Sequence, residues 1–392
     1  MERKCLVLAM EMSHKAAGIV FKRLALSMQK HLACDFICPR TDEEARRIAR
    51  FLPCTLYRRL HYKIERIPYR LQGYKLTDVI WSRINLRRIL KYVRRNDYDA
   101  VISFVHADSS APLILGDAIK KKTGLPWIVY SVDAIPTPVE WSNDLKLRER
   151  SLKHLRGHIL KADAFFSANP VMLEYEKKVF PDFRGKTGVV LTPTGSPDIK
   201  PSGGNKNGQT TFLYAGFIQG PRKIDSLLAA FEKFLEKEPS ARLVFVGNWK
   251  EYHFEGFSQL ISSGAVERHS FTKDIESFYR RADVLVDLNA NVENDVFLSS
   301  KVCNYLSYPK PILAISQDGS PVRAMMSGYN SIIHSHCNSE EIFKAMEAAS
   351  AYARHYQDDR QDLRRSFLPD VVAESFCKDI ESVLRNPKCR YR

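Results

Sequence analysis

Short apolar segments rich in β-branched residues alternate with longer amphipathic segments along most of the chain. This alternation is typical of βα units, in which helices cover a parallel sheet whose strands are buried on both faces. Helices are expected between the strands, for example over Gly18–Leu32 and Leu113–Thr123. In the first half we expect strands at Cys5–Met10, Asp35–Cys38, Ala100–Val105, Trp127–Val132, Ala164–Ser167 and Gly188–Leu191.

The alternation is interrupted once, at residues 192–208, where proline and glycine accumulate as in a linker. It then restarts, and a chain of 392 residues is long enough for two hydrophobic cores. We therefore predict an N-terminal domain over residues 1–200 and a C-terminal domain over residues 209–370. Residues 371–392 are expected to form a helix and tail that pack back on the first domain. Strands of the second domain are expected at Thr211–Ala215, Arg242–Val246, Val284–Leu288 and Pro311–Ile315.

The pattern predicts an α/β fold of two doubly wound, Rossmann-like domains. Parallel sheets of this kind bind ligands at the carboxyl ends of their strands. If the two carboxyl edges face one another, the active site lies in a cleft between the domains.

A diphosphate site is indicated where the first strand of the second domain ends. Phe212–Gly216 is followed by two adjacent cations, Arg222 and Lys223, and then by an amphipathic helix. Cations and backbone N–H groups at the start of a helix neutralise phosphate oxygens. The next strand also ends in a glycine, Gly247, where the backbone can approach a ligand or where a turn simply requires glycine.

A third group of polar residues precedes the helix predicted over Lys301–Ser307. Ser299, Ser300 and Lys301 can cap this helix and also direct donors towards a ligand. Asp295 and Asn304 are further candidates for donor contacts, and Tyr305 is interpreted as a packing residue.

In this order and spacing, these segments resemble the donor-binding domain of glycosyltransferase family 4-like enzymes with the GT-B fold. The resemblance is strongest over residues 212–316 and includes Phe278–Asp283 and Ser300–Pro311. More loosely, Thr192–Asp198 resembles the segment that precedes the second domain in the family. The resemblance implies a glycosyltransferase that takes a nucleotide-sugar donor and retains the anomeric configuration.

The sequence departs from the family pattern at the donor site. Phe217 stands where the family has an arginine, which leaves Arg222 and Lys223 as the nearby cations. The paired glutamates of the family are replaced by Val296, beside Asp295, and by Asn304.

The sequence does not identify the catalytic residues, because the histidine that the family has at the end of one acceptor-domain strand is absent here. Val132 and Asp133 occupy that position, so the candidates are Asp133, His106 and His14. A lone histidine is more often structural than catalytic. Gly18 corresponds to the glycine-containing loop on the acceptor side.

Charge and composition limit the other partners. The formal charge of +15 favours anionic partners in general. Basic pairs between residues 46 and 95 are interleaved with apolar residues, which predicts reversible association with an anionic membrane and a glycan or lipid-linked acceptor. Alternatively, these apolar residues are packed inside the domain. They are Leu52, Leu56, Leu60, Ile64, Ile67, Tyr69 and Leu71.

The Asp-x-Asp motif and the cysteines bear on cofactors and on location in the cell. Asp97 and Asp99 form an Asp-x-Asp motif, but it precedes a strand and so lies at the end opposite to the ligands. We therefore expect no essential metal and no other cofactor. Eight scattered cysteines favour a reduced, cytoplasmic setting, at most peripheral to the inner face of the membrane.

Two other functions are compatible with the sequence. One is an isomerase or hydrolase of the same fold that acts on the nucleotide-sugar itself, with Asp133 and Glu140 as its carboxylates. The other is a basic binding protein for nucleic acid or a membrane that has lost catalysis, and of these two partners nucleic acid is the less expected.

Overall fold

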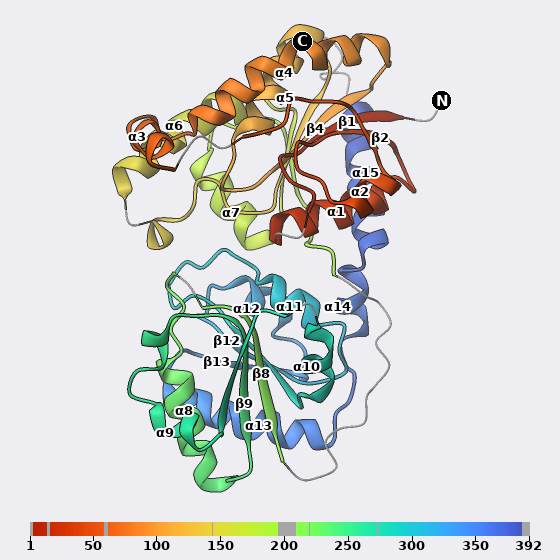
Figure 1. Ribbon diagram of the computed structural model, residues 1–392. Coiled ribbons are helices and arrows are strands. Elements are labelled where there is room, and N and C mark those ends of the chain that lie inside the picture. Colours follow the sequence, from red (N-terminus) through yellow and green to blue (C-terminus); the bar gives the residue numbers. More distant parts are fainter. Residues whose placement is uncertain are drawn as a thin grey trace. The chain divides into compact units, whose positions relative to one another are not determined.

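The computed structural model describes residues 3–13, 16–58, 62–142, 144–194, 209–218, 220–272 and 274–385. These residues form two compact units (Figure 1). One unit comprises the residues up to Pro193 together with those from Ser366 onwards, and the other runs from Thr194 to Arg365. Each unit has a parallel sheet of its own.

In its described residues, the first unit is built on a seven-stranded sheet in the order β3-β2-β1-β4-β5-β6-β7, with all neighbours parallel. The strands are β1 (Lys4–Leu8), β2 (Ala33–Ile37), β3 (Arg50–Phe51), β4 (Ala100–Val105), β5 (Trp127–Ser131), β6 (Ala164–Ser167) and β7 (Lys186–Val189). The helices are α1 (Ala16–Met28), α2 (Glu43–Ile48), α3 (Tyr62–Gln72), α4 (Leu76–Arg95), α5 (Ala111–Thr123), α6 (Leu145–Ile159), α7 (Pro170–Val179) and α15 (Pro369–Arg385), with a 3-10 turn η1 at Val139–Trp141.

Both faces of this sheet are covered, as the apolar composition of its strands requires. Every residue of β4 and β5 is buried. One face carries α1 together with α15, whose Ala373, Phe376 and Ile380 belong to the same core cluster as Phe21 of α1 and Phe104 of β4. The last described helix therefore completes the core of the first unit.

In the described residues of the second unit, six parallel strands follow the order β10-β9-β8-β11-β12-β13. The strands are β8 (Thr211–Phe217), β9 (Arg242–Asn248), β10 (Val266–Ser270), β11 (Val284–Leu288), β12 (Ile312–Ile315) and β13 (Ile332–Ser335). The helices are α8 (Asp225–Lys237), α9 (Ser258–Ser262), α10 (Ile275–Arg281), α11 (Ser300–Tyr305), α12 (Pro321–Met326), α13 (Ser339–Arg354) and α14 (Gln361–Ser366), with a 3-10 turn η2 at Glu251–Phe254.

The strand order of each sheet reverses direction once, between β1 and β4 in the first unit and between β8 and β11 in the second. The connections leave from opposite faces at these points, so a crevice forms at the carboxyl ends of the strands, where such sheets bind ligands. The loops after β4 and β8 are thus the first places to examine for function.

The predicted fold class is confirmed, because each unit is a doubly wound parallel sheet. The predicted cleft between the two domains stays a prediction. Within the described ranges, every helix is too short or too polar to span a bilayer.

Candidate functional site

Two glycines shape the carboxyl edge of the second sheet. Gly216 and Gly247 have φ values of +152° and +148°, which residues with side chains rarely adopt. A Cβ on Gly247 would collide with the carbonyl of Gly216, so glycine here lets the two strands lie close together. A Cβ on Gly216 would lie 2.7 Å from Cδ of Lys301. Gly216 therefore makes room for a lysine side chain.

Lys301 is the central cation of this edge. It lies in the first turn of α11, and its backbone N–H donates to the hydroxyl of Ser299, the N-cap, at 3.2 Å. Its ammonium lies 5.4 Å from the ring centre of Tyr214 and makes no ion pair with any residue that the structure describes. Desolvation lowers the pKa of Lys301 to about 8, and the neighbouring charge of Arg222 contributes in the same direction.

The other two predicted cations follow β8. Arg222 is half-buried and close enough to act on the pKa values of Lys301 and Asp295, whereas Lys223 is exposed. Helix α8 begins two residues after Lys223, and no described side chain caps its amino terminus. Arg222 and Lys301 are thus two cations near each other at the reversal point of the sheet, beside an uncapped helix start.

Asp295 lies in the loop between β11 and α11. Its carboxylate is buried and accepts hydrogen bonds from the N–H groups of Ala290, at 3.3 Å, and Phe297, at 3.1 Å. Burial raises the pKa of Asp295 to about 6. These contacts give Asp295 a clear role in holding the loop that carries Ser299 and Lys301.

The other residues that were predicted to contact the donor differ in their exposure to solvent. Ser300 is exposed and Asn304 is half-buried. Tyr305 is fully buried, and its hydroxyl accepts a hydrogen bond from the N–H of Ala215 at 3.1 Å, which agrees with a packing role.

The sequence reasoning missed Asp287, which lies in β11 and is fully buried. One carboxylate oxygen accepts from the side-chain amide of Asn289 at 3.0 Å, and the other has no hydrogen-bond partner within the described residues. The charge of Asp287 raises the pKa of Lys301 and opposes the effect of desolvation. An aspartate inside an otherwise apolar strand is the signal that could have identified it.

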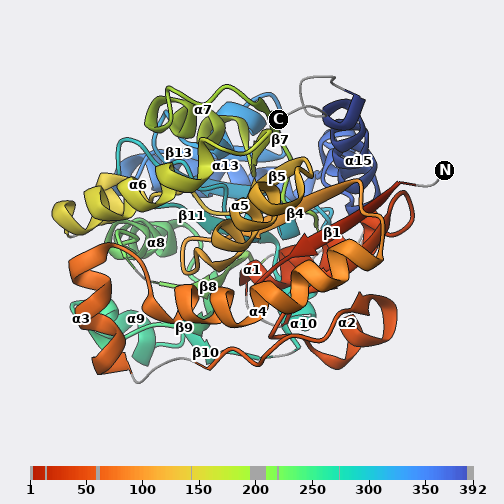
Figure 2. The same ribbon diagram turned by 90° about the horizontal axis from the view of Figure 1, so that it is seen from above.

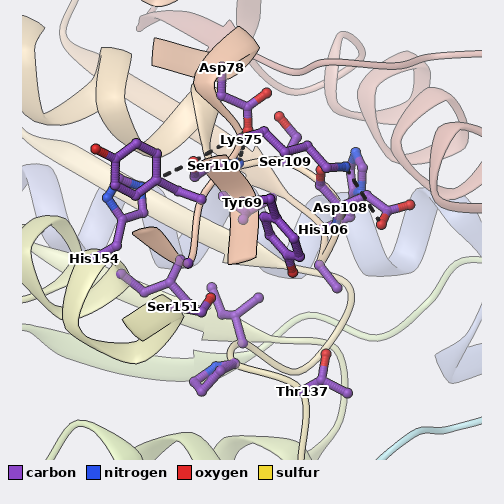
Figure 3. A pocket seen from close by; sticks show the side chains of 17 residues that line it. Tyr69, Lys75, Asp78, His106, Asp108, Ser109, Ser110, Thr137, Ser151 and His154 are labelled. Atoms are coloured by element: carbon purple, nitrogen blue, oxygen red, sulfur yellow. Dashed lines mark hydrogen bonds and ion pairs between the residues drawn. The ribbon is translucent and has the colours of Figure 1, made fainter. Parts of the chain in front are cut away.

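A pocket in the first unit lies beside the carboxyl ends of β4 and β5 (Figure 3). Five segments line it: the end of α3 and the turn after it, the start of α4, the loops after β4 and β5, and one face of α6. Its polar and aromatic lining includes Tyr69, Tyr74, Lys75, Asp78, His106, Asp108, Ser109, Ser110, Thr137, Ser151 and His154.

His106 and Asp133, two of the catalytic candidates, are brought together next to this pocket. Burial lowers the pKa of His106, against the opposing charge of Asp133. Burial raises the pKa of Asp133, whose carboxylate accepts from the N–H of Ala107 at 3.3 Å. Nδ1 of His106 accepts from the N–H of Asp108 at 3.2 Å, so in this hydrogen-bond network the neutral ring carries its proton on Nε2. Asp133 is therefore the better proton acceptor of the two.

A second buried network, which the sequence reasoning missed, forms the opposite wall of the pocket. Asp78 accepts from the N–H of Ser110 at 2.7 Å and from the hydroxyl of Tyr57 at 3.0 Å. His154 contacts the Ser110 hydroxyl at 3.1 Å and stacks on Tyr74 with ring centres 4.3 Å apart. Burial lowers the pKa of His154 to about 4, so this histidine is neutral near pH 7.

The remaining acceptor-side candidates lie near the start of α1. His14 lies outside the described residues. Gly18 is buried, and a Cβ there would come within 2.8 Å of the backbone N of Ser13, which explains the glycine by close packing.

The Asp-x-Asp motif lies at the amino end of β4, as the sequence indicates. Asp99 accepts from Arg3 at 2.6 Å and from the backbone N–H of Lys4 at 2.8 Å. These contacts tie the start of β1 to the start of β4, far along the strand from the pocket.

No protein-family model matches the chain, and no curated protein matches its sequence. Solved structures do match over nearly the whole length. The Anabaena protein HepE, solved in complex with UDP-glucose, is 11% identical with a TM-score of 0.61, and the match covers 97% of this chain and 99% of HepE. The lipopolysaccharide outer core galactosyltransferase WaaB is 12% identical with a TM-score of 0.66, over 97% of this chain and 99% of WaaB.

A third similar structure is assigned as a UDP-N-acetylglucosamine 2-epimerase from Listeria monocytogenes. It is 11% identical with a TM-score of 0.56, over 98% of this chain and 97% of that one. At such low identity these similarities concern the fold. The chain has the two-domain GT-B fold that its sequence resembles.

Proposed function

We propose that this protein is a glycosyltransferase that moves a sugar from a nucleoside-diphosphate sugar to a hydroxyl group of an acceptor. The observation that supports this most is the environment of Lys301. The ammonium of Lys301 is withdrawn from water beside Arg222, which disfavours its charged form, and the buried carboxylate of Asp287 offsets this effect only in part. The two negative charges of a nucleoside diphosphate would add further counter-charge beside these two cations.

The donor site would use side chains and backbone together. Lys301 and Arg222 would contact the diphosphate, while N–H groups at the start of α8 would donate hydrogen bonds to phosphate oxygens with help from Lys223. These groups stabilise the negative charge that develops on the leaving diphosphate. Cations of the chain would thus do what a metal ion does in other glycosyltransferases.

The acceptor would bind in the pocket of the first unit. Aromatic rings such as Tyr74 and hydrogen-bonding groups such as Ser110 and Thr137 suit the faces and hydroxyls of a saccharide. Asp133 would receive a hydrogen bond from the acceptor hydroxyl and take its proton during transfer. A glycan or a lipid-linked saccharide is the acceptor class we propose, which suits polysaccharide biosynthesis at the cytoplasmic side of a membrane.

Retention of configuration and independence from metals are part of the proposal. The first follows only from the family resemblance, and the second from the cations at the donor site. We expect turnover to survive EDTA, and a complete loss that added metal restores would contradict metal independence.

The decisive experiment follows the nucleoside diphosphate. Isothermal titration with UDP-glucose, the ligand solved with HepE, and with a panel of other nucleotide-sugars should identify a donor that the Lys301→Met variant binds more weakly. Release of the nucleoside diphosphate should then depend on an added acceptor. Binding of no nucleotide-sugar in the panel would overturn the proposal.

The epimerase-like structure keeps one rival open, an isomerase or hydrolase of the nucleotide-sugar. Such an enzyme would turn over the donor with no acceptor present. Glu140, the second carboxylate this rival would use, is exposed on η1 and does not line the pocket. Product analysis by mass spectrometry in the absence of acceptor separates the two functions.

A further inference from the structure

Helix α3 presents an apolar stripe to the solvent. Ile64, Ile67 and Leu71 follow helical spacing, and their exposed fractions are 60%, 64% and 66%. Leu56, just before the helix, is 60% exposed as well. Soluble proteins rarely leave several large aliphatic side chains uncovered on one face of a helix, so this stripe points to a partner.

Basic residues flank the stripe. Lys63, Arg66 and Arg70 are exposed, and none of them makes an ion pair with the described residues. On a helical projection they lie together next to the apolar stripe. The acidic residue of α3, Glu65, lies on the other side of the stripe and accepts a hydrogen bond from Thr77. The apolar stripe therefore carries a positive border.

The side of α3 that carries Tyr69 already packs against the rest of the first unit. Tyr69 lines the pocket of the first unit, and Gly73, with a φ of +78° after the helix, packs against the backbone at Arg150 and Ser151 of α6. Both ribbon views show α3 at the rim of its unit (Figures 1 and 2). The helix is thus held by one side and uncovered on the other.

Helix α4, which packs against α3, also carries exposed apolar residues beside exposed basic residues. Ile80 and Ile84 are 42% and 58% exposed, and Arg83, Arg87 and Arg88 between and after them are exposed too. Of the apolar residues that the sequence singled out in this stretch, Leu56, Ile64, Ile67 and Leu71 are exposed, so packing inside the domain does not account for them. Leu52 is buried, Tyr69 faces the pocket, and Leu60 lies outside the described residues.

We propose that α3 docks on an anionic lipid bilayer, with Ile64, Ile67 and Leu71 in the acyl boundary and Lys63, Arg66 and Arg70 at the headgroups. The positive charge beside the stripe distinguishes a bilayer from the other partners that α3 could bind. A second copy of the chain would bring the same cations together, and nucleic acid would leave the aliphatic stripe uncovered, whereas an anionic bilayer satisfies both features.

Docking through α3 would also place the pocket beside the membrane, because Tyr69 of the same helix lines it. A lipid-linked acceptor could then enter without leaving the bilayer. This last consequence rests on the proposed function, whereas the docking itself does not. Vesicle binding measured without any nucleotide-sugar therefore tests α3 separately from transferase activity.

The test is co-sedimentation of the full chain with phosphatidylglycerol-containing vesicles and with neutral phosphatidylcholine vesicles. We expect binding to the anionic vesicles at low salt, a loss in about 0.5 M salt on the order of fivefold for each cation that is screened, and weak binding to neutral vesicles. The triple change Ile64→Gln, Ile67→Gln and Leu71→Gln should weaken binding at least about tenfold. The matched control changes two exposed aromatics of the second unit, Tyr252→Gln and Phe271→Gln, and should bind normally.

A parallel pair of variants tests the charges. Lys63→Gln, Arg66→Gln and Arg70→Gln together should weaken anionic binding more than the same number of changes at exposed lysines of α5, α7 and α13, namely Lys121, Lys178 and Lys344. Equal effects of the two sets would show that only net charge matters and would overturn docking through α3.

Insertion can be read directly if the triple variant fails to fold. Ile67→Trp should be quenched by brominated lipid in anionic vesicles more than the tryptophans of the unchanged protein. No quenching, equal binding to neutral vesicles, or self-association that the α3 change abolishes would each overturn the proposal, the last by naming a second copy as the occupant.

Discussion

The two units withdraw different sets of charged groups from water at equivalent places in the same kind of sheet. In the first unit, burial raises the pKa values of Asp78, Asp133 and Glu176, all near the carboxyl edge. In the second, the corresponding edge carries two cations, Lys301, whose pKa desolvation lowers, and Arg222, beside the buried carboxylates of Asp287 and Asp295. In the proposed function, the carboxyl edge of each sheet gives the place where a ligand binds, and the charged groups at that edge select the ligand.

This difference suits the two halves of a transfer reaction. A site of desolvated cations favours an anionic leaving group, while a site of desolvated carboxylates favours a neutral polyol whose hydroxyls donate hydrogen bonds. Each set of charges is costly without its ligand, since desolvation opposes the charged form. The predictions below test whether the charges are functional or structural.

The largest effect is expected for Asp133→Asn. Without a proton acceptor, acceptor-dependent release of nucleoside diphosphate should fall by about 100- to 1000-fold, while donor affinity stays unchanged. The control is Asp97→Asn, an exposed carboxylate before β4 that does not line the pocket. In the unchanged protein the rate should fall as the pH drops through the raised pKa of Asp133, because the carboxylate must be ionised to act. A loss below about tenfold, or a loss of donor binding, would remove Asp133 from the acceptor side.

Glu176 should make the first unit less stable as the pH rises. Its buried carboxyl accepts from the N–H of Ile135 at 3.1 Å and contacts the hydroxyl of Ser167, and burial raises its pKa from 4.5 to about 8. The folded state therefore holds a proton that the unfolded chain releases, and this stability is present below pH 4.5 and lost as the pH rises to about 8.

The loss between about pH 5 and pH 8 should be on the order of 3 kcal/mol. Calorimetric unfolding at these two pH values measures it. Glu176→Gln should flatten the dependence, whereas Glu174→Gln, an exposed residue on the same helix, should not. If the free energy of unfolding of the Glu176→Gln variant depended on pH as steeply as that of the unchanged protein, other groups would be responsible for the pH dependence.

Lys301→Met should weaken donor binding by about 30-fold, or about 2 kcal/mol, without lowering the unfolding temperature. Removing a desolvated cation next to Arg222 relieves an unfavourable contact. In the unchanged protein the donor Kd should rise as the pH increases through about 8, where Lys301 loses its proton, and in the variant it should not.

The matched control is Lys310→Met. Lys310 is buried, and burial also lowers its pKa to about 8, but its ammonium donates to the carbonyls of Arg280, at 2.6 Å, and Ala282. This change should therefore destabilise the fold and leave donor affinity alone. Calorimetry and ligand titration on both variants would contradict the comparison if the two lysines behaved alike.

The smallest effect is expected for Lys223→Ala, because Lys223 is exposed and its charge is screened by solvent. Donor affinity should fall by about fivefold or less. Lys344→Ala, another exposed lysine of the second unit, should have no effect. A loss as large as that of Lys301→Met would make Lys223 a principal ligand of the diphosphate.

The sequence predicted the central strands well, since β4, β6 and β11 have the expected bounds. These strands are buried on both faces, so their composition alone distinguishes them. Strand β10 was not predicted, because four of its five residues are polar and the strand lies at a sheet edge. The polar residues are Glu267, Arg268, His269 and Ser270. Edge strands need no continuous apolar run, which removes the signal.

The candidate site was predicted only in outline. Gly216 and Arg222 could be named because they lie at or after the end of a predicted strand, and Lys301 because it stands at the start of a predicted helix. Both positions are properties of the local sequence. The contact of Lys301 with Tyr214, and the wall formed by Asp78, Ser110 and His154, depend on segments that are distant in the chain. Contacts between segments that are distant in the chain leave no local pattern in the sequence. They therefore could not be predicted from a single sequence.

Helix α15 has a consequence for how the chain is made. Its Ala373, Phe376 and Ile380 complete a core whose other members include residues of β1, α1 and β4. During synthesis, the first unit must therefore wait with an open apolar face until the last of these residues leaves the ribosome. The second unit is continuous in sequence and can finish folding earlier. The part of the protein that is translated first is thus the part that matures last. A chain truncated before residue 369 would expose the apolar face that α15 covers in the folded protein.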